Sequence, residues 1–421
     1  MEYFEIHGGV PLEGEIKVFA AKNSVLPMMA AAILAQSGTT RINNVPDIAD
    51  VRTMSEVLRR LGAEIEFDRQ NNVLWINTEN IRSYEAPYDL VSRMRASFLV
   101  MGPLLARFGT ARVSQPGGCA IGARPVDQHI KGFARLGAKV TEEGGYTVAR
   151  AKKLIGNTVV FDRPTHTGTE NIMMSAVLAE GRTEIINAAQ DPEIVDLAKM
   201  LNKMGAKIRG AGTSIITIDG VDTLRAVEHT PIGDRLEAGT YLFGAIATGG
   251  RVKVKNVSPA SLRTVLCKMM DMGAEVTTGR NYVAVQMRGR PRAVDIITDP
   301  FPGFPTDLQP MIMAALTIAE GTSVIWERIF ENRFIHVMEL QRLGANITIS
   351  GDRATVVGVE NLDGATVMAS DIRAGAGLVI AGLAARGKTV VKRVYHIDRG
   401  YQRLEERLRL LGASIERYDE N

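Results

Sequence analysis

Apolar stretches with helical spacing alternate with short strand-like stretches along the whole chain, and the alternation is periodic. Each period contains a Leu/Met-Gly-Ala triplet, and these triplets start at Leu61, Leu136, Met204, Met272, Leu343 and Leu411. Glycine in this position is the usual left-handed end of a helix, and the alternating residues that follow are strand-like. The pattern predicts six repeats of about 70 residues.

A second glycine marks each repeat, between an Ala-rich helix and a β-branched strand, at Gly38, Gly109, Gly181, Gly249, Gly321 and Gly387. Each repeat therefore reads strand, helix, Gly turn, strand, helix, Gly-Ala turn, strand, strand. The first helix of a repeat is very apolar, as in residues 28–34, 172–178, 311–318 and 378–383. A helix that is apolar on most sides is buried, so we expect an α/β fold with helices inside and amphipathic strands outside.

Six repeats divide naturally into two domains of three. We expect an N-terminal domain over residues 22–230 and a C-terminal domain over residues 1–21 and 231–421, with a ligand-binding cleft between them. The chain would cross near Ala20–Lys22, if the first strand belongs to the second domain, and again near Glu228–Asp234, where Pro231 and Gly233 stand. Repeats alone specify architecture, since repeat arrays serve as binding scaffolds as well as enzymes.

Composition narrows the class of protein. Of 421 residues, 45% are hydrophobic and 23% charged, which is an ordinary globular balance, and the net charge of +3 argues against a strongly basic nucleic-acid binder. Two cysteines make no disulfide framework and favour a reducing cytoplasm. The N-terminus lacks the basic and apolar regions of a signal peptide, and the longest apolar run, Val25–Ala35, is too short to span a membrane. We therefore expect a cytoplasmic protein without membrane insertion.

A glycine-rich segment at residues 115–127 carries Cys119 between two prolines. Such a loop suits a mobile lid, and the nearby Arg124 would favour a thiolate or a tuned proton donor. A passive thiol is the alternative, and the sequence leaves both open. Cys267 lies in a helical run, where a cysteine usually packs as a small hydrophobe.

Charged residues cluster where elements begin or end. Lys22, Asn23 and Ser24 stand at a strand-to-helix junction, where free N–H groups suit a phosphate or carboxylate; ordinary capping would explain Asn23 or Ser24 but not the lysine. Arginines recur in short polar segments, at Arg95, Arg124, Arg235, Arg333, Arg373 and Arg399. Taken singly, each arginine suits a surface ion pair; as a set, they predict a site for a polyanionic ligand.

Asp307 follows a proline-rich turn and precedes an apolar helix. It could cap that helix, or act as a general base in the expected cleft. The sequence holds no HExxH, Walker A or CxxC motif, and Gly375-Ala376-Gly377 lacks the context of a dinucleotide fingerprint. We therefore expect neither a metal nor an organic cofactor.

Five of these segments together resemble the enolpyruvyl transferases that act on UDP-N-acetylglucosamine. The resemblance runs from the first strand to the last helix and rests on Lys22-Asn23, the loop at 116–125, Phe-Pro-Thr-Asp at 304–307, Phe-Glu-Asn-Arg at 330–333 and His-Ile-Asp-Arg-Gly-Tyr at 396–401. It implies two inside-out α/β barrel domains, each of three similar repeats, in agreement with the repeats found independently.

The implied reaction is addition followed by elimination. The 3′-hydroxyl of UDP-N-acetylglucosamine attacks C2 of phosphoenolpyruvate while C3 is protonated, and the tetrahedral intermediate then loses phosphate. This is the first committed step of peptidoglycan synthesis. The resemblance assigns catalytic roles to Cys119 as proton donor or in product release, to Asp307 as the base for the 3′-hydroxyl, and to Lys22.

The resemblance also implies a set of substrate-binding residues. Lys22, Arg124 and Arg399 would hold the phosphate and carboxylate of phosphoenolpyruvate. Asn23 would contact the sugar, and the nucleotide sugar would be framed by Arg95, Arg124, Pro125, Val126, Asp127, Gln128, Arg163, Pro164, Thr165, His166 and Ile329. The charged site would be completed by Arg235, Arg333, Asp371 and Arg373. One departure is Thr165-His166-Thr167, where family members often have Ser-Val-Gly; His166 would add a polar contact or be exposed.

Two other functions compete with this reading. The sister transferase of the shikimate pathway would share the fold and the phosphoenolpyruvate, but the cysteine loop and Lys22-Asn23 argue for the nucleotide sugar. A non-catalytic repeat ring around nucleic acid would need a basic inner face and no dedicated cysteine loop. The oligomeric state does not follow from the sequence.

Overall fold

The computed structural model describes residues 2–115 and 126–420, and these residues form two compact units. One unit holds the chain up to Phe19 and from Gly233 onward, and the other begins at Ala20 and ends at Ile232. We call them the C-terminal unit and the N-terminal unit. Each has its own hydrophobic core, and no residue is shared between the two cores.

Each unit contains three four-stranded sheets within the described residues, and all six sheets have the same topology. An edge strand runs parallel to its neighbour, and the two remaining strands pair antiparallel. In the N-terminal unit the sheets are, in spatial order, β14 (Glu228–His229), β3 (Thr39–Ile42), β5 (Val73–Asn77), β4 (Glu64–Asp68); β6 (Glu85–Ala86), β7 (Thr110–Ser114), β9 (Tyr146–Arg150), β8 (Lys139–Glu143); and β10 (Thr158–Val160), β11 (Arg182–Ile186), β13 (Ile215–Asp219), β12 (Lys207–Arg209).

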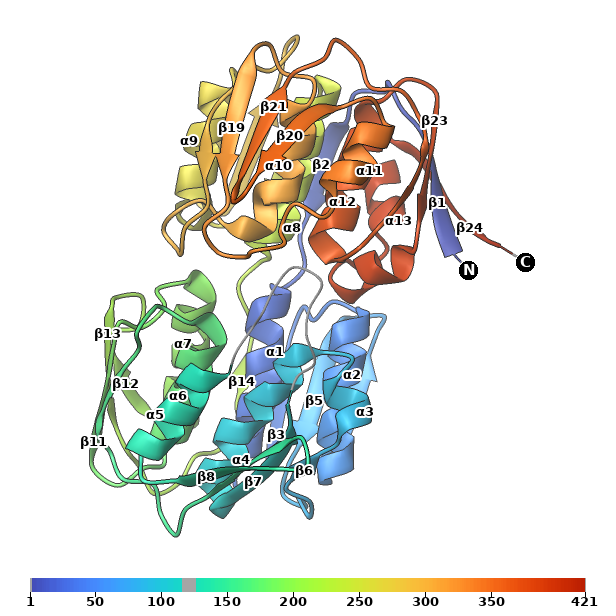
Figure 1. Ribbon diagram of the computed structural model, residues 1–421. Coiled ribbons are helices and arrows are strands. Elements are labelled where there is room, and N and C mark those ends of the chain that lie inside the picture. The colour runs from blue at the N-terminus through green and yellow to red at the C-terminus, as the bar shows by residue number, and fades with distance from the viewer. Residues whose placement is uncertain (1, 116–125, 421) are drawn as a thin grey trace. The chain divides into compact units, whose positions relative to one another are not determined.

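The C-terminal unit repeats this scheme, and two of its sheets each include a strand from the N-terminal end of the chain. Its third sheet takes β1 from the N-terminus, which pairs with β23 on one side and β24 on the other (Figure 1). The sheets are β2 (Glu13–Lys17), β15 (Arg251–Lys255), β17 (Tyr282–Gln286), β16 (Glu275–Gly279); β18 (Ile296–Ile297), β19 (Thr322–Trp326), β21 (Arg353–Val357), β20 (Asn346–Ser350); and β22 (Thr366–Met368), β23 (Lys388–Lys392), β1 (Glu2–His7), β24 (Ser414–Asp419).

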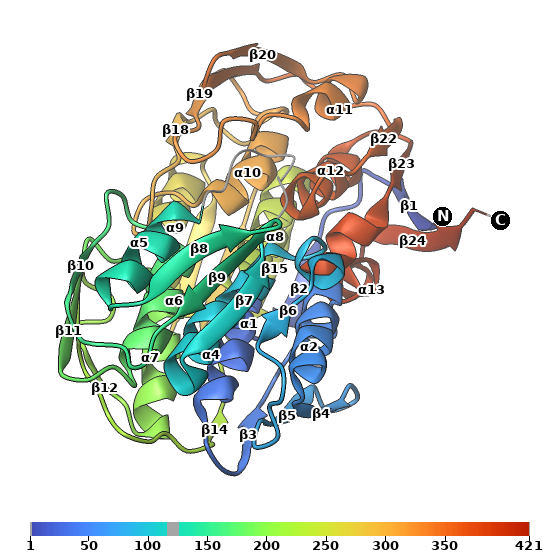
Figure 2. The ribbon, with the colours of Figure 1, turned by 60° about the horizontal axis from the view of Figure 1, so that its bottom comes forward.

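The most apolar helices form the inside of each unit, which confirms the prediction of an inside-out α/β fold. Every residue of α8 from Arg235 to Ala247 is buried, and α12 is buried from Arg373 to Leu383. Figure 2 looks onto β7, β8 and β9, with α4 packed behind them. The N-terminal unit has α1 (Lys22–Ala31), α2 (Ala49–Leu61), α3 (Tyr88–Val91), α4 (Met101–Phe108), α5 (Asp127–Arg135), α6 (His166–Ala176) and α7 (Pro192–Met204).

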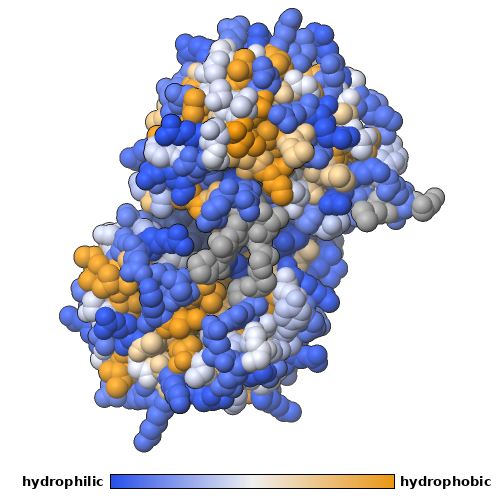
Figure 3. All heavy atoms as spheres, viewed as in Figure 1, coloured by the Kyte–Doolittle hydropathy of each residue, from blue (hydrophilic) through white to orange (hydrophobic). Residues whose placement is uncertain are grey.

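The C-terminal unit has α8 (Arg235–Thr248), α9 (Arg263–Asp271), α10 (Gln309–Leu316), α11 (Val337–Arg342), α12 (Ile372–Ala384) and α13 (Leu404–Arg409). Short 3₁₀ turns join these elements, at η1 (Ala32–Leu34), η2 (Arg95–Val100), η3 (Pro259–Leu262), η4 (Thr306–Leu308) and η5 (Val394–Arg399). The strands present polar residues outward, so the face in Figure 3 is largely hydrophilic with separate hydrophobic patches.

The Leu/Met-Gly-Ala triplets end helices as the sequence predicts. In α7, Gly205 has φ 117°, its N–H bonds to the Asn202 carbonyl, and the Ala206 N–H bonds to the Leu201 carbonyl. The other five triplet glycines also have positive φ and the same pair of bonds. This is the Schellman arrangement, which satisfies carbonyls that the helix leaves open.

Two of these glycines provide a matched test of backbone strain. An added Cβ at Gly137 (φ 90°) meets no heavy atom within 4 Å, whereas at Gly62 (φ 110°) it lies 2.6 Å from the Asn80 carbonyl oxygen. We expect Gly137→Ala to lower the free energy of unfolding by about 1–2 kcal/mol through strain alone, and Gly62→Ala to lower it by more. Urea denaturation measures both; equal losses would contradict the steric part of the argument.

Candidate active site

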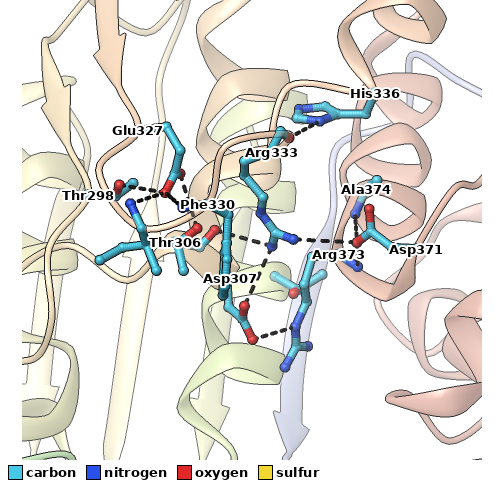
Figure 4. Close-up of polar contacts among 12 residues, drawn as sticks. Thr298, Thr306, Asp307, Glu327, Phe330, Arg333, His336, Asp371, Arg373 and Ala374 are labelled. Atoms are coloured by element: carbon cyan, nitrogen blue, oxygen red, sulfur yellow. Dashed lines mark hydrogen bonds and ion pairs between the residues drawn. The ribbon is translucent and has the colours of Figure 1, made fainter. Parts of the chain in front are cut away.

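Four charged residues that the sequence singles out lie together in the C-terminal unit, and Asp307 is at their centre (Figure 4). Its Oδ2 accepts a hydrogen bond from Arg373 Nε at 3.2 Å, and its Oδ1 lies 3.5 Å from Arg333 Nη2. Arg333 also lies 3.6 Å from Asp371 Oδ1. The two arginine side chains are 1% and 5% exposed, whereas that of Asp307 is 29% exposed. The Asp307 carboxylate is therefore partly exposed, and two buried guanidinium groups bind it.

Local structure explains how these side chains are held. Asp371 caps α12, since its Oδ1 accepts from the Arg373 and Ala374 N–H groups at 2.9 and 3.1 Å. Asp307 lies in η4, directly before α10, and the N-cap residue of α10 is Leu308. Arg333 also donates to the Thr306 carbonyl at 3.3 Å, which ties it to the turn that carries Asp307.

Arg373 begins a directed chain of hydrogen bonds. Its Nη1 donates to the Tyr401 hydroxyl at 3.0 Å, and that hydroxyl lies 2.8 Å from Thr240 Oγ1. Because Thr240 donates to the Leu236 carbonyl at 2.9 Å, the Tyr401 proton must point to Thr240. Burial lowers the pKa of Arg373, but Tyr401 and Asp307 raise it more, so the guanidinium stays charged. These hydrogen bonds fix the orientation of the Arg373 guanidinium, which stays positively charged beside Asp307.

In the N-terminal unit, Lys22 forms an ion pair with Asp50. Lys22 is the first residue of α1, and its Nζ lies 3.0 Å from Asp50 Oδ2, at the start of α2. The side chains are 13% and 5% exposed. Ala21 precedes the helix and no side chain caps it, so neither Asn23 nor Ser24 has the capping role that was the alternative. The structure thus places the Lys22 ammonium, paired with Asp50, at the N-terminus of a buried helix.

The predicted nucleotide-sugar residues of this unit lie on α5 and at the start of α6. Gln128 Nε2 donates to Asp127 at 3.1 Å and to Asp162 at 3.0 Å, which joins residues 126–128 to the segment at 163–166. Thr165 caps α6 by accepting from the Gly168 N–H at 3.3 Å. Arg163 and Pro164 are exposed.

His166 makes polar contacts on both sides of its ring. Its Nε2 lies 3.2 Å from Glu170 and its Nδ1 lies 3.5 Å from Asp191, and its side chain is 27% exposed. Burial lowers the pKa of His166, but Glu170 and Asp191 raise it well above the ordinary value. His166, between two carboxylates, therefore keeps its proton to a higher pH than a free histidine.

His129 is the opposite case, a buried histidine held neutral. Asn171 Nδ2 donates to the Phe98 carbonyl at 3.1 Å and lies 3.1 Å from His129 Nδ1, so this nitrogen accepts. Nε2 then carries the proton and lies 3.2 Å from Thr167 Oγ1. Burial, with a smaller contribution from Arg95, lowers the pKa of His129 to about 3.

These buried rings predict acid lability in both units. Burial likewise lowers the pKa of His336, in the C-terminal unit, to about 4. Between these values and the unfolded value of about 6.5, the unfolded state binds more protons, so stability is present above pH 6.5 and is lost as pH falls. We expect each of these two histidines to lower the free energy of unfolding by about 1.4 kcal/mol for each pH unit that the pH falls within that window. Urea denaturation at pH 7.5 and 5.0 tests this; equal free energies of unfolding would contradict it.

The remaining predicted residues are placed as follows. Arg235 is buried, with its guanidinium 5.4 Å from the Phe301 ring centre, beside a pocket of about 260 Å³ lined also by Arg263 and Pro305. Asn23, Arg95, Val126 and Ile329 are half-buried, and Arg399 ends η5. Cys119, Arg124 and Pro125 lie outside the described residues.

The interpretation of Cys267 as a packed small side chain is wrong. Cys267 is exposed, because α9 buries Val265, Leu266 and Met269 and turns Cys267 toward the opposite face. Within the residues that the structure describes, no group of three histidine, cysteine or acidic residues could hold a metal ion. Among those same residues, no helix combines the length and apolarity needed to cross a membrane.

Sequence reasoning missed Asp50, Glu327 and Tyr401. Asp50 looks like an ordinary acidic residue in the first turn of a helix, and Tyr401 like a core aromatic. Glu327 could have been found: it continues the buried alternation of Ser323 and Ile325 on β19, where an acidic residue is unexpected.

Comparisons with known proteins agree with this fold. The family model EPSP synthase (3-phosphoshikimate 1-carboxyvinyltransferase) matches residues 6–408. The UDP-N-acetylglucosamine 1-carboxyvinyltransferase 2 of Carboxydothermus hydrogenoformans is 55% identical over 419 residues, covering 99% of each chain. The UDP-N-acetylglucosamine 1-carboxyvinyltransferase of Psychrobacter sp. strain PRwf-1 is 52% identical over 99% of this chain and 96% of its own length.

Two solved structures extend the comparison. The enolpyruvyl transferase NikO from Streptomyces tendae has a TM-score of 0.89 at 26% identity, over 99% of both chains. EPSP synthase from Acinetobacter baumannii has a TM-score of 0.77 at 18% identity over the whole of both chains, which shows the shared fold. The chain therefore belongs to the EPSP synthase family of enolpyruvyl transferases, together with the UDP-N-acetylglucosamine 1-carboxyvinyltransferases.

Proposed function

We propose that the protein transfers the enolpyruvyl group of phosphoenolpyruvate to the 3′-hydroxyl of UDP-N-acetylglucosamine and releases phosphate, in the cytoplasm, at the first committed step of peptidoglycan synthesis. The observation that carries this proposal is the 51–55% identity, over nearly the whole chain, to relatives named for that reaction.

The geometry around Asp307 suits a base for the acceptor hydroxyl. The proposed addition joins the 3′-oxygen to C2 of phosphoenolpyruvate, gives a proton to C3, and sends the hydroxyl proton to Asp307. Elimination then breaks the C2–O bond to phosphate, which leaves with the bonding electrons, while a base takes a proton from C3 and the C2–C3 double bond forms again. Arg333 and Arg373 contact both oxygens of Asp307 while its side chain stays 29% exposed, so an acceptor hydroxyl can approach the carboxylate.

The other proposed roles are those that the family resemblance implies. Lys22 and Arg399, with Arg124, hold the phosphate and carboxylate of phosphoenolpyruvate, and Cys119 supplies the proton to C3. Asn23, Arg95, residues 125–128 and 163–166, and Ile329 contact the nucleotide sugar, while Arg235, Arg333, Asp371 and Arg373 set the charge around it. Catalysis then comes from orientation and preorganised charge.

The test is phosphate release from phosphoenolpyruvate with either UDP-N-acetylglucosamine or shikimate 3-phosphate as acceptor. We expect release that requires the nucleotide sugar. Release only with shikimate 3-phosphate would keep the family chemistry and overturn the acceptor. No release with either acceptor, from a protein with an intact cooperative unfolding transition, would contradict the proposal.

A further inference from the structure

One buried carboxylate in the C-terminal unit, to which the sequence analysis gives no role, joins two segments that carry residues assigned to the substrate. Glu327 directly follows β19 on its buried side and is 3% exposed. Burial raises the pKa of Glu327, against the hydrogen bonds of the Ile329 N–H and of neighbouring hydroxyls, which lower it. A carboxylate in such a place is costly unless hydrogen bonds compensate for its lost hydration.

Glu327 receives four hydrogen bonds from three segments. Oε1 accepts from Thr298 Oγ1 at 2.9 Å, from the Ile329 N–H at 3.0 Å and from the Phe330 N–H at 3.3 Å. Oε2 accepts from Thr306 Oγ1 at 3.0 Å. Figure 4 shows Glu327 beside Thr298, Thr306 and Phe330. The contacts fix the turn before Asp307 and the turn that leads to Arg333.

The positions of Asp307 and Arg333 therefore both depend on the Glu327 side chain. Thr306 precedes Asp307 directly, its hydroxyl is held by Glu327, and its carbonyl accepts from Arg333 at 3.3 Å. The backbone of Ile329 is held by the other oxygen of Glu327. A shift of this carboxylate would move the base, its arginine partner and a predicted sugar contact together.

We propose that Glu327 is a positioning residue for the transfer reaction, which sets the placement of Asp307 through Thr306 and that of Ile329 through its N–H. This inference rests on the proposed function of Asp307. Supporting groups of this kind matter because a displacement of about 1 Å at a reacting group can cost about a hundredfold in rate.

The test separates the two arms of Glu327. Thr306→Val keeps the side-chain shape and removes the bond to Oε2, whereas Thr306→Ser keeps the hydroxyl. We expect Thr306→Val to lower kcat about 10- to 100-fold, with the KM for phosphoenolpyruvate within about twofold, and Thr306→Ser to restore kcat to near the parent value. Because the placement of Asp307 changes, the acid limb of kcat against pH should also shift in Thr306→Val.

Thr298→Val is the matched control. It removes a bond of similar length, 2.9 Å, to the other oxygen of the same carboxylate, together with the bond that Thr298 Oγ1 accepts from the Arg328 N–H at 2.9 Å, but it leaves the bond between Thr306 and Oε2 intact. We expect a comparable loss of stability in urea with kcat within about threefold of the parent and an unchanged pH profile. Equal loss of kcat in Thr298→Val and Thr306→Val, or unchanged kcat in Thr306→Val, would overturn the proposal. If the parent protein releases no phosphate, the proposed function fails instead, which is a separate outcome.

Discussion

Replacing Asp307 by asparagine is expected to lower kcat about a thousandfold, within the usual range for loss of a general base. Asparagine has nearly the same size but accepts no proton at neutral pH. Its NH₂ group would also face one of the two buried arginines that now bind the carboxylate at 3.2 and 3.5 Å. We therefore expect a small change in the KM for phosphoenolpyruvate and a large one in kcat, measured by steady-state phosphate release.

A matched control lies on the same loop. Asp299 pairs with Arg328 at 3.2 Å, and both side chains are about half exposed, at 45% and 46%. Asp299→Asn removes a carboxylate without touching the buried cluster, and exposed pairs of this kind contribute little. Its kcat should stay within about twofold of the parent. Turnover by Asp307→Asn at the level of this control would remove Asp307 from the proton transfer.

The architecture was accessible from the sequence because the same local rules recur in every repeat. Each Leu/Met-Gly-Ala triplet needs a left-handed residue to end a helix, and its glycine adopts positive φ in all six places. The apolar helices had to be buried, and α8 and α12 are. These features depend on neighbours in sequence, so one chain is enough to identify them.

The site depended on contacts between distant segments, and these were less accessible. Asp307 and Arg373 were recognised as charges at element ends, but their pairing, 66 residues apart, required the folded unit. Tyr401 and Thr240 are separated by 161 residues, and nothing in either segment indicates that their hydroxyls meet. The sequence shows which charged side chains stand at the ends of elements, but not which side chains hold them in place.

Replacing Lys22 by glutamine should raise the KM for phosphoenolpyruvate about a hundredfold. A hydrogen bond to a charged group contributes about 1.5–3 kcal/mol, and each 1.4 kcal/mol is tenfold in affinity. The ammonium stands at the first turn of a buried helix, where the open N–H groups add positive potential for an anion. The KM for UDP-N-acetylglucosamine should change by less than about threefold, because the lost charge serves the small anion.

Asp50→Asn tests how the ammonium is held. The carboxylate lies 3.0 Å from Lys22 Nζ and is 5% exposed, so its loss frees the lysine without removing its charge. We expect a smaller rise in the KM for phosphoenolpyruvate, about tenfold. Lys153→Gln is the control for a lysine–carboxylate pair in general, since Lys153 and Glu180 form an exposed pair at 3.1 Å, and it should leave both constants unchanged. If Lys22→Gln instead raised the KM for the nucleotide sugar alone, Lys22 would belong to the acceptor side of the reaction, and another cation would have to bind phosphoenolpyruvate.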